Sequence, residues 1–227
     1  MKYWGIGIWI MVLGMVTCHP RYVRIKGEIA NFKGKVGIWT EIPGSSDTSL
    51  MAEQVVSDGK FNLRVKNLNL PAKVGISLEG KGNFWFIVDE RRGTVIQGDA
   101  DSIGSLEITG SEIERQYGLI KALYDEKYVK PLKEIEEKIR FLKKRKEAGP
   151  GEEKTLKELV RQKENYRLYR LEYSKRLIEA NPGNELSLFL LEDEFRDSLE
   201  LQRKLFLQLN IPDKESNVYK ILSDKLK

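Results

Sequence analysis

Hydrophobic and polar residues alternate along the first half of the chain, from residue 22 to about residue 110. Val23, Ile25 and Ile29, for example, fall on the same parity, and charged residues stand between them. A period of two buries one face of a β-strand and leaves the other in water. We expect about eight short strands, separated by turns that contain Gly, Asn, Asp or Pro. This spacing is typical of an antiparallel β-sandwich or an open barrel.

Two segments of this half carry more specific information. Asp58-Gly59 favours positive backbone dihedrals and predicts a type I′ turn that joins two strands in a hairpin. The segment 84–88 reads FWFIV and is apolar at every position. Because both faces of such a strand should be buried, we expect it in the middle of the sheet structure.

The apolar period lengthens to three and four residues after Gly110, as in a helix. Ser111 and Glu114 form a capping box that marks a helix start, and Pro131 should kink or split that helix. A second helix from about residue 152 to 180 should fold back on the first as an antiparallel hairpin. A third helix should bury Leu186, Phe189, Leu190, Phe195 and Leu199, and a short last helix should follow the break IPDKES. The sequence therefore predicts an α+β protein, with a β-sandwich domain over 22–110 and a helical domain over 111–227.

Charge and the scarcity of reactive side chains narrow the chemistry. The chain has 39 basic and 34 acidic residues, a net charge of +5, and the two signs alternate along the helices. This pattern indicates a solvated helical surface and argues against a nucleic-acid partner. A single cysteine and a single histidine exclude an internal disulfide and a Cys- or His-based metal cluster within one chain. We expect no catalytic residue, no metal and no cofactor.

The first seventeen residues form an apolar leader, and Cys18 follows it directly. A lysine precedes an uncharged run that is shorter than the about 20 residues of a membrane-spanning helix, and this is typical of a signal peptide. The cysteine directly after it resembles the lipid-attachment site of bacterial lipoproteins. We expect residues 1–17 to be removed, Cys18 to be acylated and residues 18–21 to form a tether.

Two alternatives for the leader remain. One is an ordinary signal peptide or an uncleaved anchor. The other is a cytosolic start in which Cys18 and His19 form a reactive pair. The second is disfavoured, because a reactive thiolate needs an electropositive, partly exposed pocket, and an apolar leader does not supply one.

Five segments spread along the chain carry a family resemblance. They read IKGEI, VVSDGKFNL, FWFIVDERRGTVIQGD, LEITGSEIERQY and NPGNELSLFLL. Their order after a lipoprotein-like leader resembles the N-terminal accessory region of envelope thiol:disulfide interchange lipoproteins of Bacteroides-type bacteria, a domain class of unknown function. Full-length members of that family continue into a thioredoxin-like domain with a Cys-x-x-Cys motif. Thiol–disulfide exchange needs a second, resolving thiol, and Cys18 is the sole cysteine of this chain. No catalytic residue of the family therefore carries over.

These observations lead us to expect a non-enzymatic lipoprotein of the cell envelope. Its membrane partner is the outer membrane, reached through the lipid on Cys18, and it should act as a binding or protein-interaction module. Candidate contact residues are Arg91 and Arg92 in a strand-end loop, and Tyr124 and Tyr169 on the concave side of the helices. A groove between the sandwich and the hairpin is a plausible place for a peptide or small ligand.

Two other functions are considered. The chain could be an accessory subunit of a separate thioredoxin-like oxidoreductase, in which case a neighbouring gene should encode a Cys-x-x-Cys protein. A hydrolase built on Glu192, Asp193 and Glu194 is disfavoured, because acidic residues on the exposed face of a helix are ordinary and no paired geometry is evident.

Overall fold

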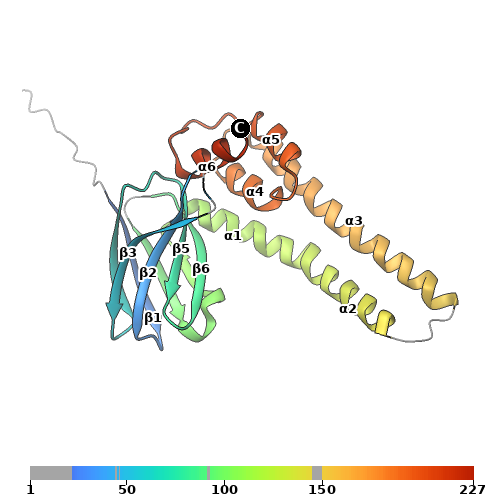
Figure 1. Cartoon of the computed structure of the whole chain (residues 1–227), viewed down its shortest axis with the longest axis horizontal. Coiled ribbons are helices and arrows are strands. Elements are labelled where there is room, and N and C mark those ends of the chain that lie inside the picture. The colour runs from blue at the N-terminus through green and yellow to red at the C-terminus, as the bar shows by residue number, and fades with distance from the viewer. Residues whose placement is uncertain (1–21, 44, 46, 91–92, 145–149) are drawn as a thin grey trace, which may run out of the picture.

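The computed structural model describes residues 22–227, apart from positions 44, 46, 91–92 and 145–149. A β-sandwich forms the N-terminal part, and helices form the remainder (Figure 1). The predicted α+β class, with its strands first and its helices second, is confirmed. Cys18, the predicted lipidation site, and Arg91 and Arg92, two of the predicted contact residues, lie outside the described residues.

The sandwich consists of two four-stranded sheets. The first has the order β4-β1-β7-β8 and the second has the order β3-β2-β5-β6. All neighbouring strands run antiparallel except β1 and β7, which are parallel. The strands span Tyr22–Ala30 (β1), Gly34–Glu41 (β2), Thr48–Val56 (β3), Lys60–Lys66 (β4), Ala72–Leu78 (β5), Gly82–Val88 (β6), Thr94–Asp99 (β7) and Glu107–Thr109 (β8), with a 3₁₀ segment η1 at Ala100–Ser105.

The core between the sheets follows the predicted alternation. Val23, Ile25 and Ile29 of β1 all point inward and are almost completely buried. Gly27 stands at the inward position between them, because the ring of Phe61 on β4 occupies the space that its side chain would fill. Sequence periodicity therefore identified the inward face of β1 correctly.

The predicted hairpin at Asp58-Gly59 is wrong. This turn connects β3 of the second sheet to β4 of the first, and the two strands do not pair with each other. Only Gly59 of the two residues has a positive φ, at 75°, whereas a type I′ turn needs two such residues. The Asp58 carboxylate instead accepts a 3.1 Å hydrogen bond from the backbone N–H of Lys60. The turn carries the chain from one layer of the sandwich to the other.

The expectation for residues 84–88 is also wrong in one respect. They belong to β6, which is the edge strand of the second sheet. Both faces are covered only at the C-terminal end of β6, because the helical part packs against the outer face there. Phe86 is buried in the sandwich core, whereas Ile87 is buried in the helical core.

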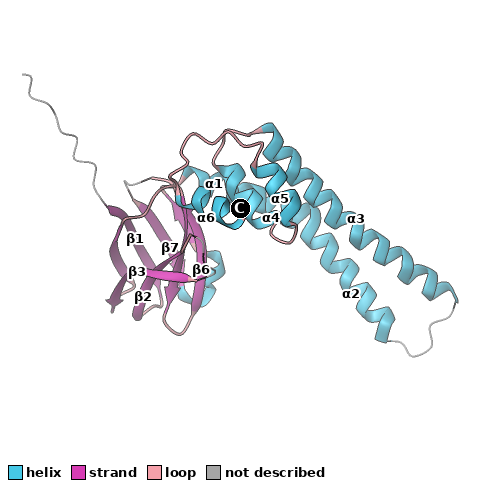
Figure 2. Cartoon of the chain, turned by 45° about the horizontal axis from the view of Figure 1, so that its top comes forward, coloured by secondary structure: helices cyan, strands magenta, loops and turns pink. Residues whose placement is uncertain are grey.

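The long helical hairpin projects away from the sandwich, as Figure 2 shows. Its first arm consists of α1 (Glu112–Tyr124), a π-helical segment η2 (Asp125–Val129) and α2 (Lys130–Lys144), and its second arm is α3 (Pro150–Ala180). Ser111 accepts a hydrogen bond from Glu114 N at 3.1 Å, which confirms the predicted helix start. The predicted irregularity at Pro131 takes the form of the π segment, which ends two residues before this proline. None of the described helices is long and apolar enough to cross a membrane.

Three short helices close the base of the hairpin. They are α4 (Leu186–Glu194), α5 (Leu199–Phe206) and α6 (Asn217–Lys225). The predicted third helix, with Leu199 inward, is wrong in its length: α4 ends at Glu194, and Leu199 begins α5 with 56% of its surface exposed. Residues Leu186 through Glu192 are all buried, so α4 forms the centre of the helical core.

Candidate functional site

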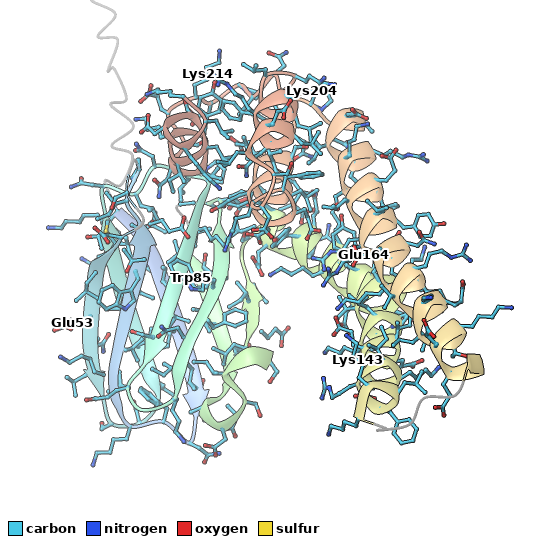
Figure 3. The ribbon with its side chains drawn as sticks, turned by 45° about the vertical axis from the view of Figure 1, so that its right-hand side comes forward. Glu53, Trp85, Lys143, Glu164, Lys204 and Lys214 are labelled. Atoms are coloured by element: carbon cyan, nitrogen blue, oxygen red, sulfur yellow. The ribbon has the colours of Figure 1, made fainter. Side chains whose placement is uncertain are left out.

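A cavity of about 860 Å³ lies where the sandwich meets the helices. We call it the junction cavity. It is lined by β5 and β6 of the second sheet and by α1, η2, α3 and residues at and beyond the end of α4. Figure 3 shows the sheet and the hairpin on the two sides of an open angle, with Trp85 on the sheet side. Its lining residues lie between positions 73 and 197 of the chain, so no single sequence motif contains them.

Lys73 on β5 joins the sheet to α4. Its side chain is only 16% exposed, and Nζ donates a 2.6 Å hydrogen bond to Oδ1 of Asp193. The Glu192 carboxylate lies 4.0 Å away from the same nitrogen. Burial alone would lower the pKa of Lys73, but the two carboxylates outweigh burial and the pKa is raised. Lys73 is therefore a protonated, paired ammonium.

Asp193 receives a second donor from α1. The hydroxyl of Tyr117 donates to Oδ2 of Asp193. Burial tends to raise the pKa of Asp193, but the charge of Lys73 and the two hydrogen bonds reverse this, so the pKa is lowered. The pKa of Tyr117 is raised, first by burial and then by the negative charge of Asp193. One carboxylate thus connects β5, α1 and α4.

Glu192 is held differently from Asp193, its neighbour in the chain. Its side chain is 7% exposed, and burial raises its pKa to about 7 against the attraction of Lys73. Glu41 on β2 adds to the rise, through its negative charge and a hydrogen bond. Glu192 does not line the junction cavity, but together with Glu41 it lines a second cavity of about 460 Å³.

Arg170 on α3 closes another side of the junction cavity. Its guanidinium donates two hydrogen bonds, of 2.7 and 2.6 Å, to the two oxygens of Glu194. The same guanidinium lies 5.3 Å from the ring centre of Tyr124. The Tyr124 hydroxyl is 2.7 Å from the Ser174 hydroxyl, and burial raises the pKa of Tyr124 to about 12. These contacts connect α1, α3 and α4.

The first turn of α1 forms hydrogen bonds with strand β6 and with Asp89, just after that strand. The Glu114 carboxylate accepts a 2.7 Å hydrogen bond from the backbone N–H of Ile87. In turn, Asp89 accepts a 2.7 Å hydrogen bond from the N–H of Ile113. Burial raises the pKa of Glu114. The sheet edge and the first turn of the helix therefore hold each other in place.

The cations of the junction cavity already have partners. Lys73 and Arg170 are bonded to acids, Lys121 lies 4.4 Å from the ring centre of Tyr117, and Arg196 is 3.5 Å from Asp193. An anionic ligand would have to displace these contacts. Among the described residues, no group of three acidic, histidine or cysteine side chains is placed to hold a metal ion. The cavity is suited to a ligand that carries hydrogen-bonding groups and little net charge.

The predicted contact residues do not form one surface. Tyr124 is buried and lines the junction cavity, so the expectation that it is exposed is wrong. Tyr169 is 61% exposed and does not line that cavity. The physical reason is the rotation of the hairpin, which turns Tyr124 toward Ser174 on the facing helix.

The acidic triplet that ends α4 was expected on an exposed helix face, and that expectation is wrong. The side chains of Glu192 and Glu194 are 7% and 8% exposed, because sheet and helices surround α4. Sequence reasoning named these acidic residues but missed their burial and their partners Lys73, Tyr117 and Arg170. The available indication was the run LSLFLL, which is apolar on all sides and so is typical of a buried helix.

Comparisons of the chain with protein-family models, with curated proteins and with solved structures give no match. The resemblance to the accessory region of thiol:disulfide interchange lipoproteins therefore stays a prediction.

Proposed function

We propose that the chain is a non-enzymatic binding module of the bacterial cell envelope, held at the outer membrane by a lipid on Cys18. Its ligand or protein partner occupies the junction cavity. The observation that carries this proposal is the cavity itself, which is formed by residues from five separate stretches of the chain. Its volume of about 860 Å³ falls in the range of small-molecule sites, roughly 300–1,000 Å³.

The paired state of the polar groups supports binding over catalysis. A nucleophilic lysine or tyrosine has to lose its proton, and the pKa of both Lys73 and Tyr117 is raised. Burial tends to raise the pKa of Asp193, but the charge of Lys73 and the hydrogen bonds that its two oxygens accept lower it. These groups are therefore fixed partners of one another, and they offer a ligand a shaped polar wall.

The geometry also favours binding with little rearrangement. Lys73, Tyr117 and Arg170 are each held by a hydrogen bond to a residue of α4. A wall fixed before the ligand arrives loses little side-chain entropy on binding. Arg196 lines the cavity with a side chain that is 60% exposed, so a partner can reach this cation.

Metabolic labelling with an alkyne-tagged fatty acid tests the anchor. The wild-type protein should incorporate the label and fractionate with the outer membrane, and Cys18→Ala should do neither. Equal labelling of the two proteins would reject the anchor.

Site-specific photo-crosslinking in the envelope tests the cavity. We would replace Arg196, whose side chain is 60% exposed, by p-benzoylphenylalanine, and replace Lys60 of β4 in the same way as a control on the other sheet. A discrete adduct at position 196 and none at position 60 is expected. No adduct, or the same adducts at both positions, would contradict binding at the cavity. An adduct with a Cys-x-x-Cys protein would favour an accessory subunit of a thioredoxin-like oxidoreductase.

A further inference from the structure

Two tryptophans flank a glycine on the outer face of the second sheet. Trp39 of β2 is the cross-strand neighbour of Gly75 on β5, and Gly75 is the neighbour of Trp85 on β6. Both indoles are half-buried, so each presents part of its surface to solvent. The two indoles belong to neither hydrophobic core, so core packing does not account for this aromatic pair.

The two rings are held in place. The indole N–H of Trp39 donates a 2.8 Å hydrogen bond to the Ser77 hydroxyl on β5. Three ring atoms of Trp85 (Cε2, Cζ2 and Cη2) lie 3.2 Å from the point where a Cβ on Gly75 would stand. The glycine therefore lets the Trp85 ring lie against the sheet. Rings that are ordered in advance present aromatic surface at low entropic cost.

A cleft of about 230 Å³ lies between these rings, and we call it the tryptophan cleft. Although charged residues make up 32% of the chain, none of the described residues that line the cleft is charged. Thr48 and Asn83 supply polar groups to its lining, and their side chains form no hydrogen bond within the described part of the chain. The cleft thus combines aromatic faces with open donors and acceptors.

We propose that the tryptophan cleft binds one ring of an uncharged oligosaccharide. A pyranose ring has an apolar face of C–H groups, which packs against an indole, and an edge of hydroxyls, which both donate and accept hydrogen bonds. The Asn83 amide and the Thr48 hydroxyl can do the same. A cavity of about 150 Å³ accommodates benzene, so about 230 Å³ has room for one substituted six-membered ring.

The position of the cleft extends the proposal to a chain of sugars. Trp85 lines both the tryptophan cleft and the junction cavity. An oligosaccharide with one ring in the cleft can therefore extend its next rings into the junction cavity. The cleft lies on the sandwich alone, so sugar binding there depends neither on the lipid on Cys18 nor on a protein partner at Arg196.

Nuclear magnetic resonance of the indole N–H groups tests the proposal directly. The full-length protein is kept in a phosphocholine detergent, because a glycoside detergent would compete for the cleft. The probes are cellotetraose, chitotetraose and mannotetraose, and Trp39→Phe and Trp85→Phe assign the two signals. We expect at least one tetrasaccharide to shift the signals of both Trp39 and Trp85.

Variants separate stacking from hydrogen bonding. Trp85→Ala should weaken that sugar roughly 5- to 100-fold, the range found for loss of one aromatic stacking surface. Asn83→Ala and Thr48→Ala change exposed residues that pack little, so they should fold normally and still bind more weakly. Tyr169→Ala removes an exposed aromatic residue on α3 and serves as the matched control.

Three outcomes would overturn the proposal. The first is no indole shift with any of the three sugars. The second is equal binding of Asn83→Ala, Thr48→Ala and wild type. The third is an equal or larger shift with a hexaproline peptide, which would assign the cleft to a protein segment. None of these results would bear on crosslinking at position 196, so the two proposals fail independently.

Discussion

Lys73 on strand β5 and Asp193 on helix α4 are 120 positions apart in the chain and form a 2.6 Å hydrogen-bonded ion pair. The second oxygen of Asp193 accepts the hydroxyl proton of Tyr117 on α1. Through this carboxylate the sandwich and two helices are connected at one point. The shape of the junction cavity depends on that connection, because all three residues line it.

Replacing Lys73 by methionine should destabilise the protein strongly. Methionine keeps the length and the apolar stem, but it leaves Asp193 and the buried Glu192 without their cation. Breaking a buried pair on one side costs about 3 kcal/mol or more. The free energy of unfolding, measured in urea, should fall by about that amount.

Lys60→Met provides the control for this loss. Lys60 pairs with Glu28 at 3.6 Å, and both side chains are more than half exposed. Exposed pairs contribute little, so a change below about 1 kcal/mol is expected. Equal effects of the two substitutions would show that the Lys73 pair does not hold the helices on the sandwich.

Stability should depend on pH through Glu192. Burial raises its pKa from 4.5 to about 7 in the folded chain, where Lys73, Glu41 and Asp193 face it. Between these two values the folded chain keeps a proton that the unfolded chain has released. The free energy of unfolding must therefore fall as the pH rises from about 4.5 to about 7. Below about pH 4 the lowered pKa of Asp193 acts in the opposite direction, so stability also falls on acidification.

Urea unfolding at a series of pH values checks this dependence. Glu192→Gln cannot titrate, so it should show a smaller fall between pH 4.5 and 7 and should exceed wild type in stability at pH 8. Part of the fall should remain, because the pKa values of Glu114 and Glu185 are also raised by burial. The exposed Glu53→Gln should keep the wild-type slope. A Glu192→Gln curve parallel to wild type throughout would contradict the assignment.

Local patterns predicted the strands and helices of this fold well, because burial of one face makes apolar residues recur at a fixed spacing along the element. The parity of Val23 and Ile25 and the hydrogen bond from Glu114 N to the Ser111 hydroxyl both depend on residues a few positions apart. The Glu114 half of the predicted capping box does not form, because that carboxylate accepts from Ile87 N on the sheet. The place of residues 84–88 could not be predicted in that way. An edge strand covered by helices and a central strand covered by sheets have the same apolar sequence, and only the tertiary arrangement distinguishes them.

The junction cavity was less predictable than the strands. A groove between sandwich and hairpin could be anticipated from the order of the elements, but its residues could not. Lys73 occurs in a strand that alternates normally, and Asp193 occurs in a run of acids that usually indicates solvent. Their pairing depends on how α4 packs against β5, and no short-range pattern records that contact.

Gly27→Ala should disrupt the sandwich core. A Cβ at this position would lie 2.1 Å from Cζ of Phe61, so the buried ring would have to move. Overpacking of this kind costs about 1–3 kcal/mol. Thermal unfolding should show a lower midpoint for Gly27→Ala and little change for Gly104→Ala, where nothing lies within 4 Å of the added carbon. An unchanged midpoint for Gly27→Ala would mean that the Phe61 ring does not fill this space.

The two-bond pairing of Arg170 with Glu194 predicts a graded series of variants. Arg170→Lys keeps the charge but cannot donate to both carboxylate oxygens, so it should cost about 1 kcal/mol. Arg170→Met leaves the buried Glu194 carboxylate without a cation, and a loss of about 2 kcal/mol is expected after allowance for the partial exposure of Arg170.

The pair of Arg176 and Glu172 on the same helix is the matched control. Arg176 Nε lies 3.0 Å from the Glu172 carboxylate, and both side chains are exposed to solvent. Arg176→Lys and Arg176→Met should each change the free energy of unfolding by less than about 0.5 kcal/mol. If Arg170→Met were no more harmful than Arg170→Lys, charge at position 170 would be irrelevant to Glu194. The order of the two losses, measured by urea unfolding at pH 8, therefore decides whether the pairing of Arg170 with Glu194 stabilises the contact between α3 and α4. A stabilising ion pair requires the larger loss for methionine, because only that variant removes the positive charge beside the Glu194 carboxylate.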